Sequence, residues 1–261
     1  MSPEGQSTLL KSNSATSREG LSIPLLVALL PIRTVLLLAA QLVWALVFYW
    51  QGNSHPWRSS AAWWTVYGTL ADLGCLALMS ACLRTQGLRL RDLLGTSTHS
   101  LVGVLGRGLA YFLVVTPFFV GGFLLSSYIV YGDFTPHVDA RLLGARRLPL
   151  IAALYSLVIW WPLWSTTEEL TYQTFFLQRL RRLLNGPARA MVIVGFWWAA
   201  QHCALPFLPD YRYLLWRFLS FVPGVLALMA IYMRTGQIRP LIVAHSFLDL
   251  IACASTLDWS F

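Results

Sequence analysis

The chain has 261 residues, of which 57% are hydrophobic and 11% are charged, and its formal net charge at pH 7 is +8. A typical soluble domain is about 25% charged, and a mean hydropathy of +0.60 leaves too little polar surface to cover a water-soluble protein. The composition therefore predicts an integral membrane protein embedded in a lipid bilayer, and it argues against a soluble globular domain.

The first segment is polar. Residues 1–20 are rich in Ser and predict a disordered tail. They lack the short apolar run and the small-residue cleavage site of a signal peptide, so we expect no processing.

Seven apolar segments follow. A helix needs about 20 apolar residues to cross the hydrocarbon core, and lipid offers the backbone no hydrogen-bond partners, which favours helices over open strands. The expected spans are 34–50, 61–83, 108–131, 158–178, 188–208, 213–233 and 240–259. An interfacial segment at 21–32 is expected before the first span, and the fourth span is 158–178 if Pro162 breaks the apolar segment that begins at 148. The predicted fold is an all-α polytopic transmembrane bundle of about seven spans.

Basic residues predict the orientation, because Lys and Arg are enriched in cytoplasmic loops. This also explains the positive net charge without nucleic acid, which is not an expected partner. With the N-terminus inside, 13 basic residues fall on the inner side and six on the outer side. The inner set is Lys11, Arg18, Arg33, Arg84, Arg89, Arg91, Arg107, Arg179, Arg181, Arg182, Arg189, Arg234 and Arg239; the outer set is Arg58, Arg141, Arg146, Arg147, Arg212 and Arg217. The bias favours a cytoplasmic N-terminus and an external C-terminus.

Ionisable residues inside the spans are the candidate functional groups, since a central charge costs about 2.5–3.5 kcal/mol on insertion scales. Glu168 and Glu169 lie in the middle of the fourth span, and His202 lies in the fifth. His245 and Asp249 lie one helical turn apart in the seventh, so they share a face. A buried carboxylate can act as a general base, and histidines can orient a water or stabilise an oxyanion. One Glu with two His also has the ligand types of a catalytic zinc site.

Structural interpretations stand beside the functional ones. The histidines could be hydrogen-bonded interior residues, the acidic pair could be structural or translocate ions, and His245 could simply bond Asp249. Asp72, in the second span with no visible partner, is interpreted as structural. Trp197 and Trp198 are expected to pack, and so are the four cysteines, which are Cys75, Cys82, Cys203 and Cys253.

Three short motifs in order resemble those of the CPBP family, which comprises CAAX proteases and bacteriocin-processing enzymes and is also called Abi. The run from Glu168 to Gln173 resembles the EExxxR motif, and the run from Trp198 to His202 resembles FxxxH. The segment 221–249, with Gly224 and the closing His245-Ser-Phe-Leu-Asp249, resembles the last family block. The resemblance covers about 150–255, so we expect N-terminal membrane spans at 21–147 and a catalytic membrane core at 148–261.

The resemblance implies an intramembrane endopeptidase of the bacterial plasma membrane. Glu168 would activate a water held by His202, while His245 and Asp249 would polarise the scissile carbonyl. Glu169, Gln173 and Trp198 would support these groups. The family has been described both with and without a metal; a metal-free reaction is favoured here, and zinc on Glu168, His202 and His245 is the alternative. The expected substrate is a hydrophobic or membrane-anchored peptide cut near its C-terminus.

Two residues depart from the family pattern. Gln173 replaces an Arg that would neutralise Glu169, so Glu169 is either protonated or paired with another group, and the protonated form is favoured. Trp198 replaces Phe and would narrow the pocket beside His202.

The same fold could also serve as a non-catalytic immunity or binding protein, or as a small transporter. If the chain is a protease, Glu168, His202 and His245 should share one cavity open toward the cytoplasm. Glu168 and His202 should then lie within about 6 Å of each other, or two hydrogen-bond lengths.

Overall fold

The computed structural model describes residues 22–96, 100–134 and 147–257, and every regular element in these ranges is helical. In chain order the elements are α2 (Ile23–Leu29), α3 (Ile32–Trp50), α4 (Pro56–Ala61), α5 (Trp64–Arg84), η1 (Leu90–Leu94), α6 (Leu101–Tyr131), α8 (Leu150–Tyr155), η2 (Ser156–Trp160), α9 (Trp161–Glu168), η3 (Glu169–Leu177), α10 (Gln178–Leu183), α11 (Pro187–Gln201), η4 (His202–Ala204), α12 (Tyr211–Thr235) and α13 (Ile238–Ser255). The polar tail expected at 1–20 lies outside the described residues.

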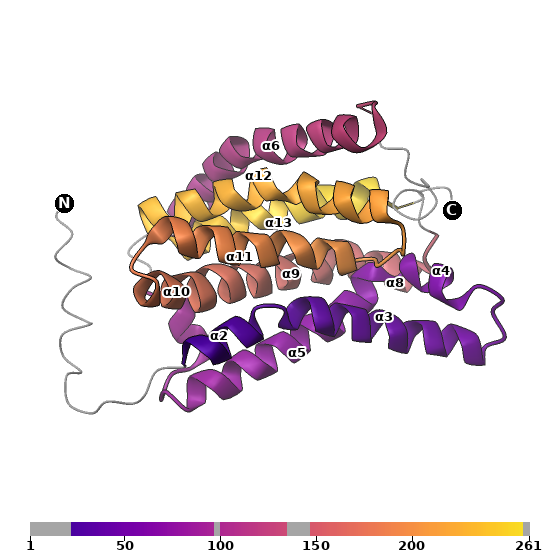
Figure 1. Ribbon diagram of the computed structural model, residues 1–261, viewed down its shortest axis with the longest axis horizontal. Coiled ribbons are helices and arrows are strands. Elements are labelled where there is room, and N and C mark those ends of the chain that lie inside the picture. Colours follow the sequence, from indigo (N-terminus) through magenta and orange to yellow (C-terminus); the bar gives the residue numbers. More distant parts are fainter. Residues whose placement is uncertain (1–21, 97–99, 135–146, 258–261) are drawn as a thin grey trace.

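The helices run alternately along the long axis of the bundle (Figure 1). Six helical stretches within the described residues are long and apolar enough to cross a membrane, among them 150–183, which joins α8 to α10. A seventh pass is made by α11, whose 15 residues are fewer than a full crossing needs. The polytopic helical bundle is thus confirmed, and about seven spans is compatible with it.

Apolar side chains also cover the outside of the bundle. Large residues such as Leu42 on α3, Leu113 on α6 and Ile251 on α13 are more than half exposed. In water such a surface would be a large apolar patch of the kind that soluble monomers rarely present. Lipid is the environment in which this surface is stable.

The fourth span is longer than expected, because Pro162 does not break it. The helix runs on through Pro162, which lies just after the π-helical segment η2, and a local π-helical adjustment is one way in which membrane helices accommodate a proline. The preceding segment η2 and the later segment η3 are both π-helical. Such segments are rare and are often found at functional sites; here η3 begins at Glu169.

The segment before the first span is also helical. Residues 23–29 form α2, with Pro24 in its first turn, and α3 starts at Ile32, so Pro31 separates two helices of one apolar stretch that is counted as a single candidate span of 28 residues.

Glycines allow α6 to pack closely on α12. A Cβ on Gly122 would lie 2.5 Å from the carbonyl oxygen of Ser220, and one on Gly224 would lie 2.5 Å from the ring of Phe119. Neither position has room for a side chain. The helices that precede the family motifs are therefore in direct contact with those that carry them.

Arg33 is not the loop residue that the count of basic residues assumed. It lies in the first turn of α3, is completely buried, and its Nη1 donates to Asp72 Oδ1 over 2.8 Å. Asp72 therefore has a charged partner on the neighbouring span. The expectation failed because Arg33 lies close to Pro31, which suggests a loop, whereas the interior offers the guanidinium hydrogen-bond acceptors that the lipid does not.

Candidate active site

Glu168 is a buried carboxylate at the end of α9 that is surrounded by donors. Trp198 Nε1 donates to its Oε2 and Gln201 Nε2 donates to its Oε1, each over 2.6 Å. Arg33 Nη2 lies 3.7 Å from Oε1. An ionised carboxylate only accepts hydrogen bonds, so these surroundings suit the anionic form.

His202 faces the same carboxylate across a short gap. Its Nδ1 lies 2.9 Å from the carbonyl oxygen of Trp198, which can only accept, so Nδ1 carries a hydrogen. In the neutral ring Nε2 is then an acceptor, and it lies 3.9 Å from Glu168 Oε1. Two acceptors do not bond each other, but one water molecule can donate to both. The ring is held by stacking on Phe221, with 3.5 Å between centroids.

His245 links the two glutamates. Its Nδ1 lies 3.0 Å from Glu169 Oε1, while its Nε2 lies 3.6 Å from Glu168 Oε2. Gln173 Nε2 donates to the other oxygen of Glu169 over 2.7 Å. Glu169 is therefore paired with His245. Pairing with another group was one of the two alternatives expected for Glu169 in the absence of the family's Arg. Whether the shared proton resides on Glu169 or on His245, the pair carries no net charge.

Asp249 lies one turn beyond His245 and completes the group. Its Oδ2 is 3.7 Å from His245 Nε2 and has no hydrogen-bond partner among the described residues. His245 Nε2 thus faces two carboxylates, which favours a hydrogen on that nitrogen. All four predicted catalytic side chains converge, despite the different depths of their positions along the spans.

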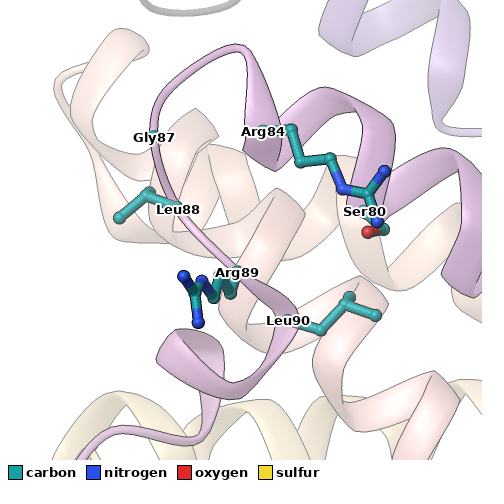
Figure 2. A pocket seen from close by; sticks show the side chains of 6 residues that line it. All are labelled: Ser80, Arg84, Gly87, Leu88, Arg89 and Leu90. Atoms are coloured by element: carbon teal, nitrogen blue, oxygen red, sulfur yellow. The ribbon is translucent and has the colours of Figure 1, made fainter.

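A cavity of about 460 Å³ reaches His202, His245 and Asp249, whereas Glu168 is fully buried and does not line it, although it was expected to share the cavity. Its polar lining includes His202, His245, Asp249 and Arg217, and its apolar lining is Trp64, Phe119, Phe123, Trp160, Trp164, Leu205, Pro206, Trp216, Phe221, Leu248 and Ala252. A second cavity, of about 380 Å³, contains none of the predicted residues. Figure 2 shows its lining on the end of α5 and on the loop that leads into η1. The first cavity is therefore the candidate active site.

The cavity extends toward the end of the bundle where α13 ends, since Ser255 and Thr256 also line it. In Figure 1 this is the end opposite to the start of α2. A cytoplasmic N-terminus and a cavity open to the cytoplasm therefore exclude each other, although both were expected. Without Arg33 the inner basic residues still outnumber the outer ones twelve to six, which favours the predicted orientation and a cavity facing outward.

Sequence reasoning missed Arg33 and Gln201 as contributors to the site, and it expected Trp198 as a supporting residue without its contact to Glu168. Arg33 was assigned to a loop, and Gln201 was treated only as an unspecified position of the FxxxH motif. Trp198 was expected to narrow the pocket, but its indole nitrogen bonds Glu168 directly. The sequence signal that could have identified Gln201 is its polarity. A polar side chain in an apolar span is costly unless it has a hydrogen-bond partner, so Gln201 was a candidate for such a contact.

The donor set does not suit a metal ion. Both oxygens of Glu168 accept short N–H hydrogen bonds, and the guanidinium of Arg33 adds a positive charge nearby. A cation would have to compete with these donors and with that charge. Within the described ranges no group of three His, Cys, Asp or Glu side chains is arranged to hold a metal.

Comparison with known proteins finds a family model that matches the region carrying this site. Residues 149–251 match the family model of Rce1-like type II CAAX prenyl endopeptidases, and the match includes every predicted motif residue from Glu168 to Asp249. No curated protein and no solved structure matches the chain. Residues 149–251 therefore resemble the CPBP family of CAAX proteases and bacteriocin-processing proteins, in agreement with the three motifs.

Proposed function

We propose that this protein is an intramembrane endopeptidase in which Glu168 activates a water molecule. The observation that carries the proposal is the gap between Glu168 Oε1 and His202 Nε2, which are 3.9 Å apart beside the cavity. Both groups are acceptors, so a water placed there would have both hydrogens bound and its lone pairs free to attack a carbonyl carbon.

The reaction would proceed by general base catalysis. The water oxygen bonds to the carbonyl carbon and its proton passes to Glu168. Glu168 then returns that proton to the amide nitrogen as the C–N bond breaks, which yields a carboxylic acid and an amine. An N–H at His245 Nε2 would stabilise the oxyanion, and Asp249 would assist if protonated or through a water.

The proposed substrate is a hydrophobic or membrane-anchored peptide, cut near its C-terminus or anchor. Two features support it: the aromatic lining of the cavity, which includes Trp64, Trp160 and Trp164, and its position between membrane-spanning helices. An apolar cavity with a few polar groups at one end binds apolar ligands in a defined orientation.

The test is cleavage of a lipid-anchored peptide by the purified protein in detergent or liposomes. Glu168→Gln should abolish cleavage, a loss of about 10²–10⁴-fold in kcat, because an amide cannot take the proton from water. Ser126→Ala is a suitable control, since Ser126 bonds Ser220 between α6 and α12 and does not line the cavity. Equal cleavage by wild type and Glu168→Gln would refute Glu168 as the base, and no cleavage by the wild type would favour a binding protein or a transporter.

Metal removal separates the two proposed chemistries. Because the donors around Glu168 disfavour a cation, we expect dialysis against a strong chelator to leave kcat unchanged. Loss of activity on chelation, restored by added zinc, would contradict the metal-free reaction.

A further inference from the structure

An arginine from outside the family-matched region lies beside Glu168. Arg33 belongs to α3, whereas the match begins at residue 149. Its side chain is fully buried, and its guanidinium carbon lies 4.5 Å from the ring centroid of Trp164. A cation at such a position is costly in a membrane protein unless its surroundings compensate it, and an intramembrane charge is a functional candidate by default.

Arg33 determines which end of the Gln201 amide faces the catalytic carboxylate. Its Nε donates to Gln201 Oε1 over 2.7 Å, and Tyr172 donates to the same oxygen over 3.0 Å. A guanidinium has only donors, so the amide oxygen must turn toward Arg33. The amide nitrogen is then left to donate to Glu168 Oε1 over 2.6 Å. The reversed amide would place donor against donor and oxygen against carboxylate.

The guanidinium also faces Glu168 directly. Its Nη2 lies 3.7 Å from Glu168 Oε1 and has no hydrogen-bond partner among the described residues. An unbonded donor of a buried cation is unfavourable, and the carboxylate that it faces is stabilised as an anion at this distance.

A purely structural role would be an ion pair that fastens α3 to α5 through Asp72. That role uses Nη1, which bonds Asp72 Oδ1 over 2.8 Å. It leaves Nε and Nη2 unexplained, and these are the two nitrogens on the side of Gln201 and Glu168. The fork geometry of arginine allows one side chain to engage both sides at once.

We propose that Arg33 is a positioning residue for Glu168. It orients the Gln201 amide and holds Glu168 as an anion, with the remaining side of the carboxylate turned toward His202 and His245. The proposal rests on the proposed proteolytic function, and it makes the helices before the matched region part of the active site.

The test compares three variants, because a single substitution leaves a buried charge unpaired. Arg33→Gln and Asp72→Asn each break the same ion pair, so both should lower the melting temperature. The double variant Arg33→Gln/Asp72→Asn removes both charges and should recover the melting temperature in part.

Activity separates the roles. If Arg33 positions Glu168, kcat should fall about 10- to 100-fold in Arg33→Gln and remain low in the double variant, with little change in KM. Asp72→Asn should lose much less kcat, since it leaves Arg33 beside Gln201. A double variant that recovers both stability and kcat would show that the pair is structural only and would overturn the proposal.

A spectroscopic measurement decides the point even if the wild-type protein cleaves no test substrate. The indole N–H of Trp198 bonds Glu168 Oε2 over 2.6 Å, so its NMR resonance, identified by its loss in Trp198→Phe, reports on the carboxylate. We expect this resonance to shift in the double variant and to stay near its wild-type position in Asp72→Asn. Equal shifts in both, or no shift in either, would refute the positioning role independently of proteolysis.

Discussion

Two adjacent glutamates have different environments. Glu168 is bound by indole and amide donors from α11, whereas Glu169 is bound by Gln173 one turn away and by His245 on α13. Successive helix positions point about 100° apart, so neighbours in sequence face different helices. This division leaves Glu168 available as a base and makes Glu169 the partner that orients His245.

Trp198 provides a test at the residue scale. Its ring stacks on Tyr172 and its N–H bonds Glu168, so Trp198→Phe keeps an aromatic ring but removes one donor. We expect kcat to fall about 10- to 100-fold, measured on the peptide substrate. Trp197→Phe is the matched control, because Trp197 packs on Phe196 on the same helix, whereas the indole donor to Glu168 belongs to Trp198. Equal losses in the two variants would contradict a role for that donor.

Gln173 provides a second test. It is fully buried, and its Oε1 has no hydrogen-bond partner among the described residues. Because His245 already pairs with Glu169, an arginine at position 173 adds a charge without a free counter-ion, and the cost could reach a few kcal/mol. We expect Gln173→Arg to lower yield and melting temperature more than Gln173→Leu. If Gln173→Arg raised the melting temperature and Glu169→Gln strongly lowered yield and melting temperature, Glu169 would be ionised and without a cation.

At the scale of elements, the contact between α6 and α12 depends on small residues. Van der Waals packing of close backbones is a main source of helix association in membranes. Gly122 is therefore expected to be intolerant of any side chain, whereas a Cβ added to its neighbour Gly121 would have nothing within 4 Å.

Gly121 and Gly122 allow a matched experiment within one helix. Gly122→Ala should lower stability by about 1–3 kcal/mol through overpacking against Ser220. Gly121→Ala should be neutral or stabilising by up to about 1 kcal/mol, because alanine favours the helix over glycine. Thermal unfolding in detergent measures both. A similar effect of the two substitutions would mean that the helices separate easily at this point.

At the scale of the whole molecule, orientation determines which side of the membrane supplies the substrate. The basic residues favour a cytoplasmic N-terminus, and reporters fused at Ser14 and Phe261 should then lie on opposite sides. Both reporters on the same side would contradict an odd number of spans.

The cavity should open away from the cytoplasm in that orientation. A cysteine at Thr256, which lines the cavity, should react with a membrane-impermeant thiol reagent added outside the cell, in a background without native cysteines. A cysteine at exposed Arg84, at the opposite end, should be protected. The reverse labelling pattern would place the cavity on the cytoplasmic side.

The sequence by itself determined the class of protein and the approximate order of the spans, and it predicted four candidate catalytic residues. Long apolar runs require lipid, and the ionisable residues within them stand out because each is costly there. The predictions from the sequence were wrong where the local pattern was ambiguous. Pro162 suggested a break, but the helix continues through it from the π-helical segment η2, and Arg33 resembled a loop charge close to Pro31.

Tertiary structure alone decided which groups meet and toward which end of the bundle the cavity extends. Arg33 and Gln201 are 168 residues apart in the chain and yet share a hydrogen bond, and no periodicity within a helix relates them. The partner of Glu169 was equally hidden, because His245 comes from another span. A buried polar group must find a partner wherever packing provides one, so the sequence shows that a partner is needed, whereas the packing of the helices determines which residue it is.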